Sequence, residues 1–506
     1  MKKLIVLSSL VIPMAVMAQT PENTIKYNWQ GANGTARVQA LGGASGALGG
    51  EISTLFSNPA NIGFYKNSEA VISGGVNFLN NKSTFYGDSY NTKENRGFLG
   101  TTGLVFGRGR SQGRSGAFSV GVTQLANFNN QVTYFGHNND GSSMADAFIA
   151  DVKNHGGDRD QYGSDLAYKT YWINPTGGGN YSSPASAIAK TNGLFQDMDI
   201  STSGQINELA FGGGKQVSDR VYLGATVGIP MMKYDETRRY YEEDPTNNND
   251  NDFKSASYNT KLMTNGEGFN IKLGALFNLS DRFRVGLAAH TPTWYSITQS
   301  FDANADVNTE NLVKDGTDNG KAQIFAQPDH VLEFDYRIRT PYKVMGSATA
   351  LFGDIYTPNA TKGFITGDIE YIDYSASKYS VTHSQDRGTA DEDVLKSTNS
   401  VIKNAYKGAV NVKLGTEVKF NTLAVRLGGA YFGGPYNDII GEKGSMYQAS
   451  GGLGYRGNGF FIDLAYVHNI KNDVDAPYRV EKPLAISPAE IKTTNSRLML
   501  TLGVKL

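Results

Sequence analysis

The sequence predicts an all-β protein, a transmembrane antiparallel β-barrel of about 14 strands. Three observations favour this class. Apolar and polar residues alternate with period two through most of the chain, as they do in strands that have two different faces. The connections between these segments alternate between short and long. Glycine makes up 59 of 506 residues, and beyond the signal-like N-terminus no apolar run approaches the roughly 20 residues of a membrane-spanning helix.

Composition excludes several functional classes. The 47 basic and 48 acidic residues nearly cancel, which argues against a nucleic-acid-binding protein. The absence of cysteine excludes a disulfide framework, a Cys-ligated zinc and a thiol nucleophile. The histidines form no close cluster, and no P-loop or nucleophile elbow is complete. We therefore predict no enzyme, no cofactor and no metal site. A hydrolase assembled from several strands is the alternative that spacing rules do not detect.

The first 18 residues fit a secretory signal peptide. Lys2 and Lys3 form a positive start, and residues 4–17 form an apolar stretch. Val16 and Ala18 supply the small residues of a signal peptidase site. We expect residues 1–18 to be removed after Sec export, which makes the outer membrane the expected location of a barrel.

The expected strands cover residues 69–506. In residues 282–291, Phe283, Val285 and Leu287 share one face, and the other face mixes glycine, alanine and charge. A purely apolar outer face and a mixed inner face suit a lipid-exposed wall around a lumen. A periplasmic all-β protein is the alternative. The expected strands are 69–79, 97–107, 116–133, 205–216, 220–240, 254–280, 282–300, 331–352, 362–381, 402–419, 422–432, 446–456, 459–469 and 494–506.

The connections define the two ends of the barrel. Short connections suit periplasmic turns, and long ones suit extracellular loops. Short ones are expected near 108–115, 217–219, 281, 353–361, 420–421 and 457–458. Long ones are expected near 80–96, 134–204, 241–253, 301–330, 382–401, 433–445 and 470–493, with 134–204 and 301–330 the most prominent.

Residues 19–68 precede the first expected strand and lack sustained alternation. Their richness in glycine and alanine fits either a periplasmic tail or a plug inside the lumen. The segment 35–49, which reads TARVQALGGASGALG, resembles the plug of the FadL/TodX (OMPP1) family. Residues 58–63, NPANIG, are similar to that family's NPA motif, and residues 266–292 are similar to its middle strands. Residues 47–50, ALGG, resemble the Bacteroidetes branch of the family.

The resemblance implies an outer-membrane channel for passive uptake of long-chain fatty acids or aromatic hydrocarbons. Residues 19–68 would then be the plug, or hatch, which rearranges and lets ligand leave sideways into the bilayer. The plug-motif residues would be Gly42, Gly43, Asn58, Pro59 and Ala60. An ordinary Asx-Pro turn is the structural alternative for this corner. The implied partners are the hydrophobic substrate, outer-membrane lipids and the barrel-assembly machinery, and we expect a monomer that binds no nucleic acid.

The long loop 134–204 is the best candidate for ligand capture. It carries many apolar and aromatic residues, among which we select Phe148, Ile149, Trp172 and Phe195. Ser142 or Ser143 with Asp146 predicts the start of a short helix, one face of which would carry Met144, Phe148 and Val152. These residues would either form a hydrophobic groove or pack the loop onto the barrel rim.

Charged residues on the expected inner face are a second group of candidates. They would bind a ligand carboxylate or, more commonly, pair across the lumen or contact water. The residues are Lys272, Arg284, Asp368, Glu370, Arg426 and Asp463. The acidic stretch 242–252 lacks the spaced ligands of a calcium loop.

A rival function comes from another class. Barrels of type IX secretion resemble the same family and bind or shuttle proteins at the cell surface. A protein partner that co-purifies without bound lipid would favour that alternative.

Overall fold

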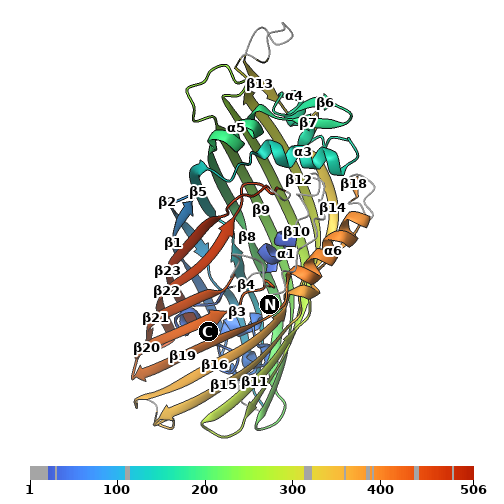
Figure 1. Ribbon diagram of the computed structural model, residues 1–506. Helices are drawn as coiled ribbons and strands as arrows, with labels where there is room; N and C mark the ends of the chain where they lie inside the picture. The colour runs from blue at the N-terminus through green and yellow to red at the C-terminus, as the bar shows by residue number, and fades with distance from the viewer. Residues whose placement is uncertain are drawn as a thin grey trace, which may run out of the picture.

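The computed structural model describes residues 21–28, 31–108, 114–310, 312, 322–357, 360–382, 388–389, 392–437, 444–480 and 484–506. The expected signal peptide, residues 1–18, lies outside the described residues. Figure 1 shows a single barrel with tight turns at its lower end and helices around its upper end. Among the described residues, no helix is long and apolar enough to cross a membrane.

The wall is a closed barrel of 14 antiparallel strands. Five of them are interrupted, and each interrupted strand has two labels. In chain order the wall consists of β1 (Glu69–Phe85), β2 (Asp88–Leu99) with β3 (Thr102–Arg108), β4 (Gly116–Asn127) with β5 (Asn130–Asn138), β8 (Leu194–Gln216), β9 (Val221–Glu243), β10 (Ser255–Asn278), β11 (Phe283–His290) with β12 (Trp294–Asn308), β14 (Leu332–Arg339) with β15 (Lys343–Gly353), β16 (Lys362–Asp373) with β17 (Lys378–Val381), β19 (Gly408–Phe420), β20 (Leu423–Phe432), β21 (Met446–Arg456), β22 (Phe460–Asp475) and β23 (Ala489–Lys505).

The last strand closes the wall onto the first. β23 pairs antiparallel with β1 from Glu69 opposite Lys505 to Thr84 opposite Glu490. The predicted fold class and strand number are therefore confirmed. Each expected strand segment corresponds to one strand of the wall, because a lipid-facing wall requires an apolar residue at every second position.

The outer face of the wall is apolar. On β11, Phe283 and Leu287 point outward and are 57% and 54% exposed. The next residue, Ala288, points inward and is buried. On β23, Leu498, Leu500 and Leu502 are all exposed. In water such a belt would be an unusually large apolar surface. It is the surface that a bilayer requires of a barrel.

The first expected long loop, 80–96, is wrong. β1 and β2 continue through this region and meet at a two-residue turn, Tyr86-Gly87, so that Phe85 lies opposite Asp88. Both turn residues have positive φ, 46° and 94°, as tight hairpin turns require. The polar composition of 80–96 suggested a loop because this hairpin extends beyond the apolar belt, where neither face needs apolar residues.

Other boundaries also differ from expectation, since β12, β22 and β23 extend into the expected long loops 301–330 and 470–493. The largest loop is shorter than 134–204, because β5 ends at Asn138 and β8 begins at Leu194. A helix, α6 (Glu392–Ala405), occupies the start of the expected strand 402–419. The long-loop side also carries α3 (Met144–Asn154), α4 (Ser164–Lys169), β6 (Asn174–Gly177), β7 (Asn180–Ser182), α5 (Pro184–Asn192), β13 (Gln323–Ala326), η6 (Tyr374–Ala376) and β18 (Gly388–Thr389).

The N-terminal segment lies inside the barrel as a plug (Figure 1, blue). It contains α1 (Pro21–Asn28), α2 (Ala36–Ala40), η2 (Ile52–Phe56) and η3 (Pro59–Phe64). α2 packs on β20–β23, and η3 packs on β8–β10. A periplasmic tail, the other arrangement that composition allowed, is therefore wrong.

Candidate functional site

The plug corner at Asn58 is held on both sides. The Asn58 amide nitrogen donates to the carbonyl oxygens of Gly46 in the plug, at 2.7 Å, and of Ala275 in β10, at 3.2 Å. Its side-chain oxygen accepts from the Ala60 backbone nitrogen and caps η3. Pro59 occupies the first turn, where its missing N–H has no partner to lose. Asn58 and Ala60 are fully buried, so this corner joins the plug to the wall.

Glycines in the wall let the plug backbone approach closely. Gly214, Gly224 and Gly274 lie side by side in register on β8, β9 and β10. A Cβ atom on Gly224 would lie 2.4 Å from the Pro59 carbonyl, and one on Gly274 would lie 2.0 Å from the Asn58 side-chain oxygen. Such distances are impossible without displacement, so this glycine row is a seat for η3. The sequence did not predict this seat, because a glycine in a strand gives no indication of which segment packs on it.

A second glycine seat supports the other half of the plug. Gly42 has φ +68° and Gly43 has φ +83°, conformations that suit glycine. Across from them, Gly415 and Gly428 are paired in register on β19 and β20. A Cβ atom on Gly428 would lie 2.2 Å from the Gly42 nitrogen. The predicted plug glycines are thus packed directly on the wall.

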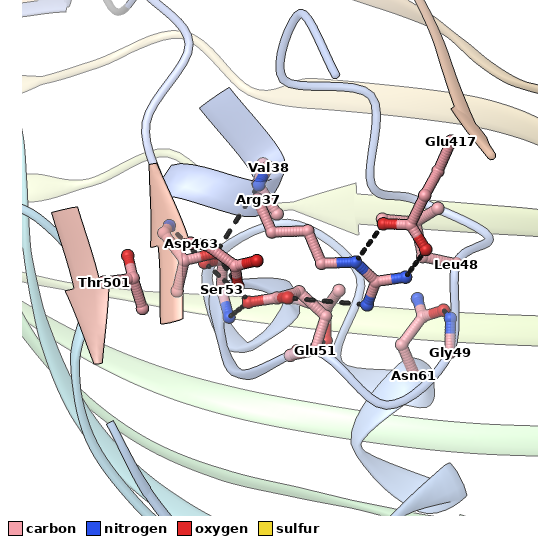
Figure 2. Close-up of polar contacts among 12 residues, drawn as sticks. Arg37, Val38, Leu48, Gly49, Glu51, Ser53, Asn61, Glu417, Asp463 and Thr501 are labelled. Atoms are coloured by element: carbon pink, nitrogen blue, oxygen red, sulfur yellow. Dashed lines mark hydrogen bonds and ion pairs between the residues drawn. The ribbon is translucent and has the colours of Figure 1, made fainter. Parts of the chain in front are cut away.

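Arg37 is the centre of a charged contact between plug and wall, shown in Figure 2. Its Nε and Nη2 atoms contact the two carboxylate oxygens of Glu417 on β19 at 2.9 and 3.2 Å. Its Nη1 atom lies 3.8 Å from Glu51 of the plug. Sequence reasoning missed Arg37 as a site residue, because its partner Glu417 is far away in the chain.

Two predicted lumen charges extend this contact. Arg426 is 1% exposed and binds Glu417 at 2.5 Å and Asp463 at 2.7 Å. Asp463 also accepts from Arg456. The charges form one chain from the plug through β19, β20 and β22, as expected for buried ions that must be paired. They are structural partners of one another.

The other predicted lumen charges also have partners. Asp368 accepts from the backbone nitrogens of Ser45 and Gly46 in the plug. Arg284 donates to the carbonyl of Leu48 at 2.7 Å. Lys272 pairs with Glu208.

Glu370 stands between two lysines. Lys343 lies 3.3 Å and Lys413 3.5 Å from its carboxylate. All six predicted charges therefore have partners, which are charges on nearby strands of the wall or backbone groups of the plug.

The loop residues selected for capture are not gathered in one open groove. Phe148 and Trp172 are fully buried and meet edge to face with ring centroids 5.4 Å apart. Ile149 is half-buried against the same cluster. Phe195 lies apart from them on β8, where it packs against Phe135. The predicted helix is confirmed as α3, with its Ser143–Asp146 capping box and buried Met144, Phe148 and Val152.

The loop is anchored to the barrel by a buried carboxylate. Glu242, at the upper end of β9, accepts from Trp172 Nε1 at 3.0 Å and from the Ser143 hydroxyl. It also accepts from the Met144 backbone nitrogen and the Tyr240 hydroxyl. Phe148 and Trp172 therefore pack the loop onto the barrel rim, which was the second alternative for this loop.

A charged contact also fixes α4 within the loop. Burial alone would raise the pKa of the Asp165 carboxyl, but hydrogen bonds from Lys169 and Arg159 hold this pKa below its ordinary value. The contact stabilises the fold of the loop outside the membrane.

Above α2 and η3, a cluster of apolar and aromatic side chains packs inside the barrel. Tyr27 on α1 meets Phe128 and Tyr234 edge to face. The same cluster continues over the inner faces of β5, β9, β10, β12 and β14 through Tyr134, Met232, Leu262, Ile297, Phe334 and Tyr336. Such a lining suits apolar ligands. We call this region the upper lumen.

The wall beside the upper lumen is interrupted. β2 is paired with β1 but, among the described residues, forms no ladder with β5. Side chains bridge the interval instead, because Asn81 of β1 donates to Asn130 and to the Gln131 carbonyl, and Thr92 of β2 donates to that same carbonyl. Most residues of β2 are exposed. We call this interval the β2–β5 gap.

The plug touches the strand that bends at this gap. β4 shifts register against β8 between Gln124 and Ala126, and the strand breaks before β5. Asn33 of the plug donates to the carbonyl of Leu125, the residue at the shift, at 2.9 Å. A movement of the plug would therefore reach the gap directly.

The fold matches solved structures of a FadL homologue and of two toluene transporters. A FadL homologue from Pseudomonas aeruginosa aligns over 94% of this chain and 99% of its own, with a TM-score of 0.57 and 13% identity. The toluene transporter TbuX of Ralstonia pickettii aligns over 95% and 100%, with 0.50 and 12%. The toluene transporter TodX of P. putida aligns over 94% and 99%, with 0.51 and 11%. No family model and no curated protein sequence matches the chain.

These findings define the class in two steps. A closed barrel with an apolar outer belt and an internal plug is a plugged transmembrane β-barrel. Within that class, the chain has the fold of the FadL homologue and of TodX along nearly its whole length. The resemblance stated from the sequence is therefore confirmed at the level of the fold.

Proposed function

We propose that this protein is a FadL-type channel for passive uptake of hydrophobic small molecules through the outer membrane. The observation that carries the proposal is an apolar upper lumen, closed below by a plug and flanked by the β2–β5 gap. The FadL homologue, TbuX and TodX support the coarse assignment, since two of them are described as toluene transporters. In this proposal residues 1–18 are the signal peptide, 19–68 the plug and 69–506 the barrel.

The proposed route begins at the long loops. Ligand would enter between them and transfer into the upper lumen, where aromatic side chains replace its contact with water. The plug blocks continuation along the barrel axis, because η3 and α2 are seated on opposite parts of the wall. The lower end of the β2–β5 gap, where Val76 of β1 and Leu99 of β2 are exposed in the apolar belt, then offers a sideways exit into the bilayer. Lateral release needs no energy source for a solute that prefers lipid.

Plug rearrangement is the proposed control of this exit. Asn33 connects the plug to Leu125 at the bend. A ligand that contacts Tyr27 on α1 would act on the same plug. The plug-motif residues Gly42, Gly43, Asn58, Pro59 and Ala60 hold it in its closed position.

A cross-link across the gap tests the proposal. The chain has no cysteine, so Asn81→Cys with Asn130→Cys introduces a single defined pair, whose parent side chains are 2.6 Å apart. The pair would be joined by a short bis-methanethiosulfonate, with which each cysteine thiolate forms a disulfide and releases methanesulfinate; a reductant cleaves the link. The control pair, His468→Cys with Ser496→Cys, joins β22 to β23 across an intact ladder. Uptake of labelled long-chain fatty acid and of toluene would be measured in cells lacking the native protein.

We expect wild type and the cross-linked control to restore uptake, and the cross-linked gap variant to restore it only after the link is cleaved. Wild-type uptake through the cross-linked gap would refute lateral release there. Failure of the wild type to take up either compound, at normal surface levels, would refute the channel, and the protein-binding alternative would then be examined by pull-down.

A further inference from the structure

Three cations lie together on the outer face of the wall, where β14 runs toward the long loops (Figure 1). Arg337 and Arg339 of β14 and Lys378 of β17 are all exposed, whereas the alternating residues Ile338 and Tyr379 point inward and are buried. Arg339 lies directly opposite Lys378 in the ladder, and Arg337 is two residues away on the same face. Like charges that lie directly opposite one another destabilise a sheet. We call this cluster the outer basic patch, and its charge calls for an anion.

The wall does not neutralise this patch as it does other exposed cations. On β9, Lys233 lies 3.6 Å from the carboxylate of Asp235, and Arg239 lies 3.9 Å from that of Asp199. Among the described residues, none of the three patch cations has an ion pair. The patch therefore has a surplus of positive charge that an external group would have to balance.

Two carboxylates on the same strands of the wall bind elsewhere. Asp335, the next outward position of β14, accepts a hydrogen bond from the Thr298 hydroxyl of β12 at 2.8 Å. Asp373, at the end of β16, caps η6 by accepting from the backbone nitrogen and hydroxyl of Ser375. Both carboxylates thus accept from neutral groups, and the patch keeps its surplus.

The patch lies at the level where the apolar belt ends. Trp294 of β12 lies directly opposite Arg339, is 40% exposed and stacks on Phe269 with ring centroids 4.9 Å apart. Tyr342, three residues closer to the short-turn end than Arg339, is also exposed. Exposed aromatic side chains mark the membrane–water interface of a barrel. The outer basic patch therefore stands at the height of the lipid head groups, on the side of the long loops.

We propose that the outer basic patch binds the phosphate of a phosphorylated glycolipid, lipid A, in the outer leaflet of the membrane. A guanidinium forms two parallel hydrogen bonds with a phosphate, and the Lys378 ammonium adds a point charge. Arg339 is already oriented, since its Nη2 donates to the Ala376 carbonyl at 3.3 Å. A phosphate monoester carries about −1.5 to −2 charge, so three cations match it better than they match a singly charged phosphodiester. The acyl chains would lie along exposed Tyr342 and Val344 of the belt.

The test is lipid binding to the purified protein in a neutral detergent, measured by native mass spectrometry. The probes are bis-phosphorylated lipid A, the same lipid A with its phosphates removed, and phosphatidylglycerol. The patch variant carries Arg337→Gln, Arg339→Gln and Lys378→Gln. The control variant carries Lys233→Gln and Arg239→Gln, which are exposed cations that already have carboxylates beside them. The heat-modifiable mobility of each variant would establish that its barrel is closed.

We expect wild type and the control variant to bind phosphorylated lipid A about tenfold or more tightly than either other lipid. In the patch variant this preference should fall to within about twofold, and Lys378→Gln alone should have an intermediate preference. Equal binding of the three lipids by wild type, a preference for phosphatidylglycerol, or a preference that the patch variant keeps or the control variant loses would overturn the site.

This inference goes beyond the proposed transport function and rests only on the proposed location in the outer membrane. The site is on the outside of the wall, and the binding test contains no transported solute. Its failure would therefore leave the channel proposal intact, and failed uptake would leave the lipid site intact.

Discussion

The amide of Asn33 in the plug donates a 2.9 Å hydrogen bond to the backbone carbonyl of Leu125 in the wall. Leu125 is the residue at which β4 slips in register against β8. The bond therefore joins the segment that closes the lumen to the strand that bends away at the β2–β5 gap. Plug and wall are therefore in contact at this bend through the Asn33 side chain.

Breaking this link should loosen the bend. Asn33→Ala leaves the Leu125 carbonyl without its partner, a loss on the order of 1 kcal/mol. We expect backbone amides of residues 126–130 to exchange hydrogen roughly fivefold faster, as measured by mass spectrometry. Asn174→Ala removes a similar amide-to-carbonyl bond in the outer loop and should leave this exchange unchanged. Unchanged exchange in Asn33→Ala would disprove the coupling.

Removing the Asn58 side chain should open the plug. Asn58→Ala loses bonds to Gly46, Ala275 and Ala60, together on the order of 2–3 kcal/mol. The absence of cysteine allows a reporter at Ala47→Cys, which is fully buried in the closed state. Labelling of this thiol by a water-soluble maleimide should accelerate more than tenfold.

Asn67→Ala is the control for the Asn58 variant, because Asn67 lies just beyond η3 and its side chain is exposed. Its labelling rate should equal that of the reporter alone. If Asn58→Ala also labels at that rate, the corner is an ordinary turn that does not hold the plug.

The barrel was predictable from sequence, whereas most of the plug contacts were not. Period-two alternation identified a segment of each of the 14 strands of the wall, because lipid imposes one rule along the wall. No local rule connects Arg37 with Glu417, or Pro59 with Gly224, since each contact joins distant parts of the chain. The polar hairpin around Tyr86-Gly87 was not predicted, because beyond the bilayer both faces of a strand can be polar and the alternation is lost.

The glycine seat under η3 gives a steric prediction. A Cβ on Gly224 would lie 2.4 Å from the Pro59 carbonyl carbon and oxygen, and backbone cannot turn aside as a side chain can. Gly224→Ala should therefore lift η3 and increase ionic conductance in planar bilayers severalfold. Gly346→Ala on β15 is the control, because no atom lies within 4 Å of its new methyl group. Equal conductance in the two variants would mean that the plug accommodates the methyl group.

The buried Glu242 should control the outer loop. Glu242→Gln replaces an acceptor-only carboxylate that receives Trp172, Tyr240, Ser143 and Met144. An amide cannot accept all four bonds, so the loop should detach more often and be cut by trypsin at Lys153 and Lys169 at least tenfold faster.

Trp172→Phe serves as the graded companion of the Glu242 variant. It removes one hydrogen bond and keeps most of the ring packing on Phe148, so its cutting rate should lie between those of wild type and Glu242→Gln. If Trp172→Phe abolishes ligand uptake while its cutting rate stays at the wild-type value, Trp172 acts in capture and the anchoring role assigned here is wrong.

The Arg37–Glu417 contact predicts an asymmetric pair of variants. Arg37→Gln leaves Glu417 paired with Arg426. Glu417→Gln leaves Glu51, 3.8 Å away, as the nearest carboxylate to Arg37 among the described residues, inside a site that offers little water. We therefore expect Glu417→Gln to accelerate labelling of the Ala47→Cys reporter more than Arg37→Gln does, and the double variant to be less disrupted than the sum of the two.

The burial of the Arg37–Glu417 pair also predicts the size of its coupling free energy and how that energy depends on salt. A charge-assisted pair of this kind should give a coupling of about 1–3 kcal/mol in the double-mutant cycle. Because Arg37 and Glu417 are both largely shielded from solvent, the coupling should change little between low and high salt, unlike that of a surface pair. Additive single-variant effects would show that Arg37 fills space in the plug and does not tie it electrostatically to the wall.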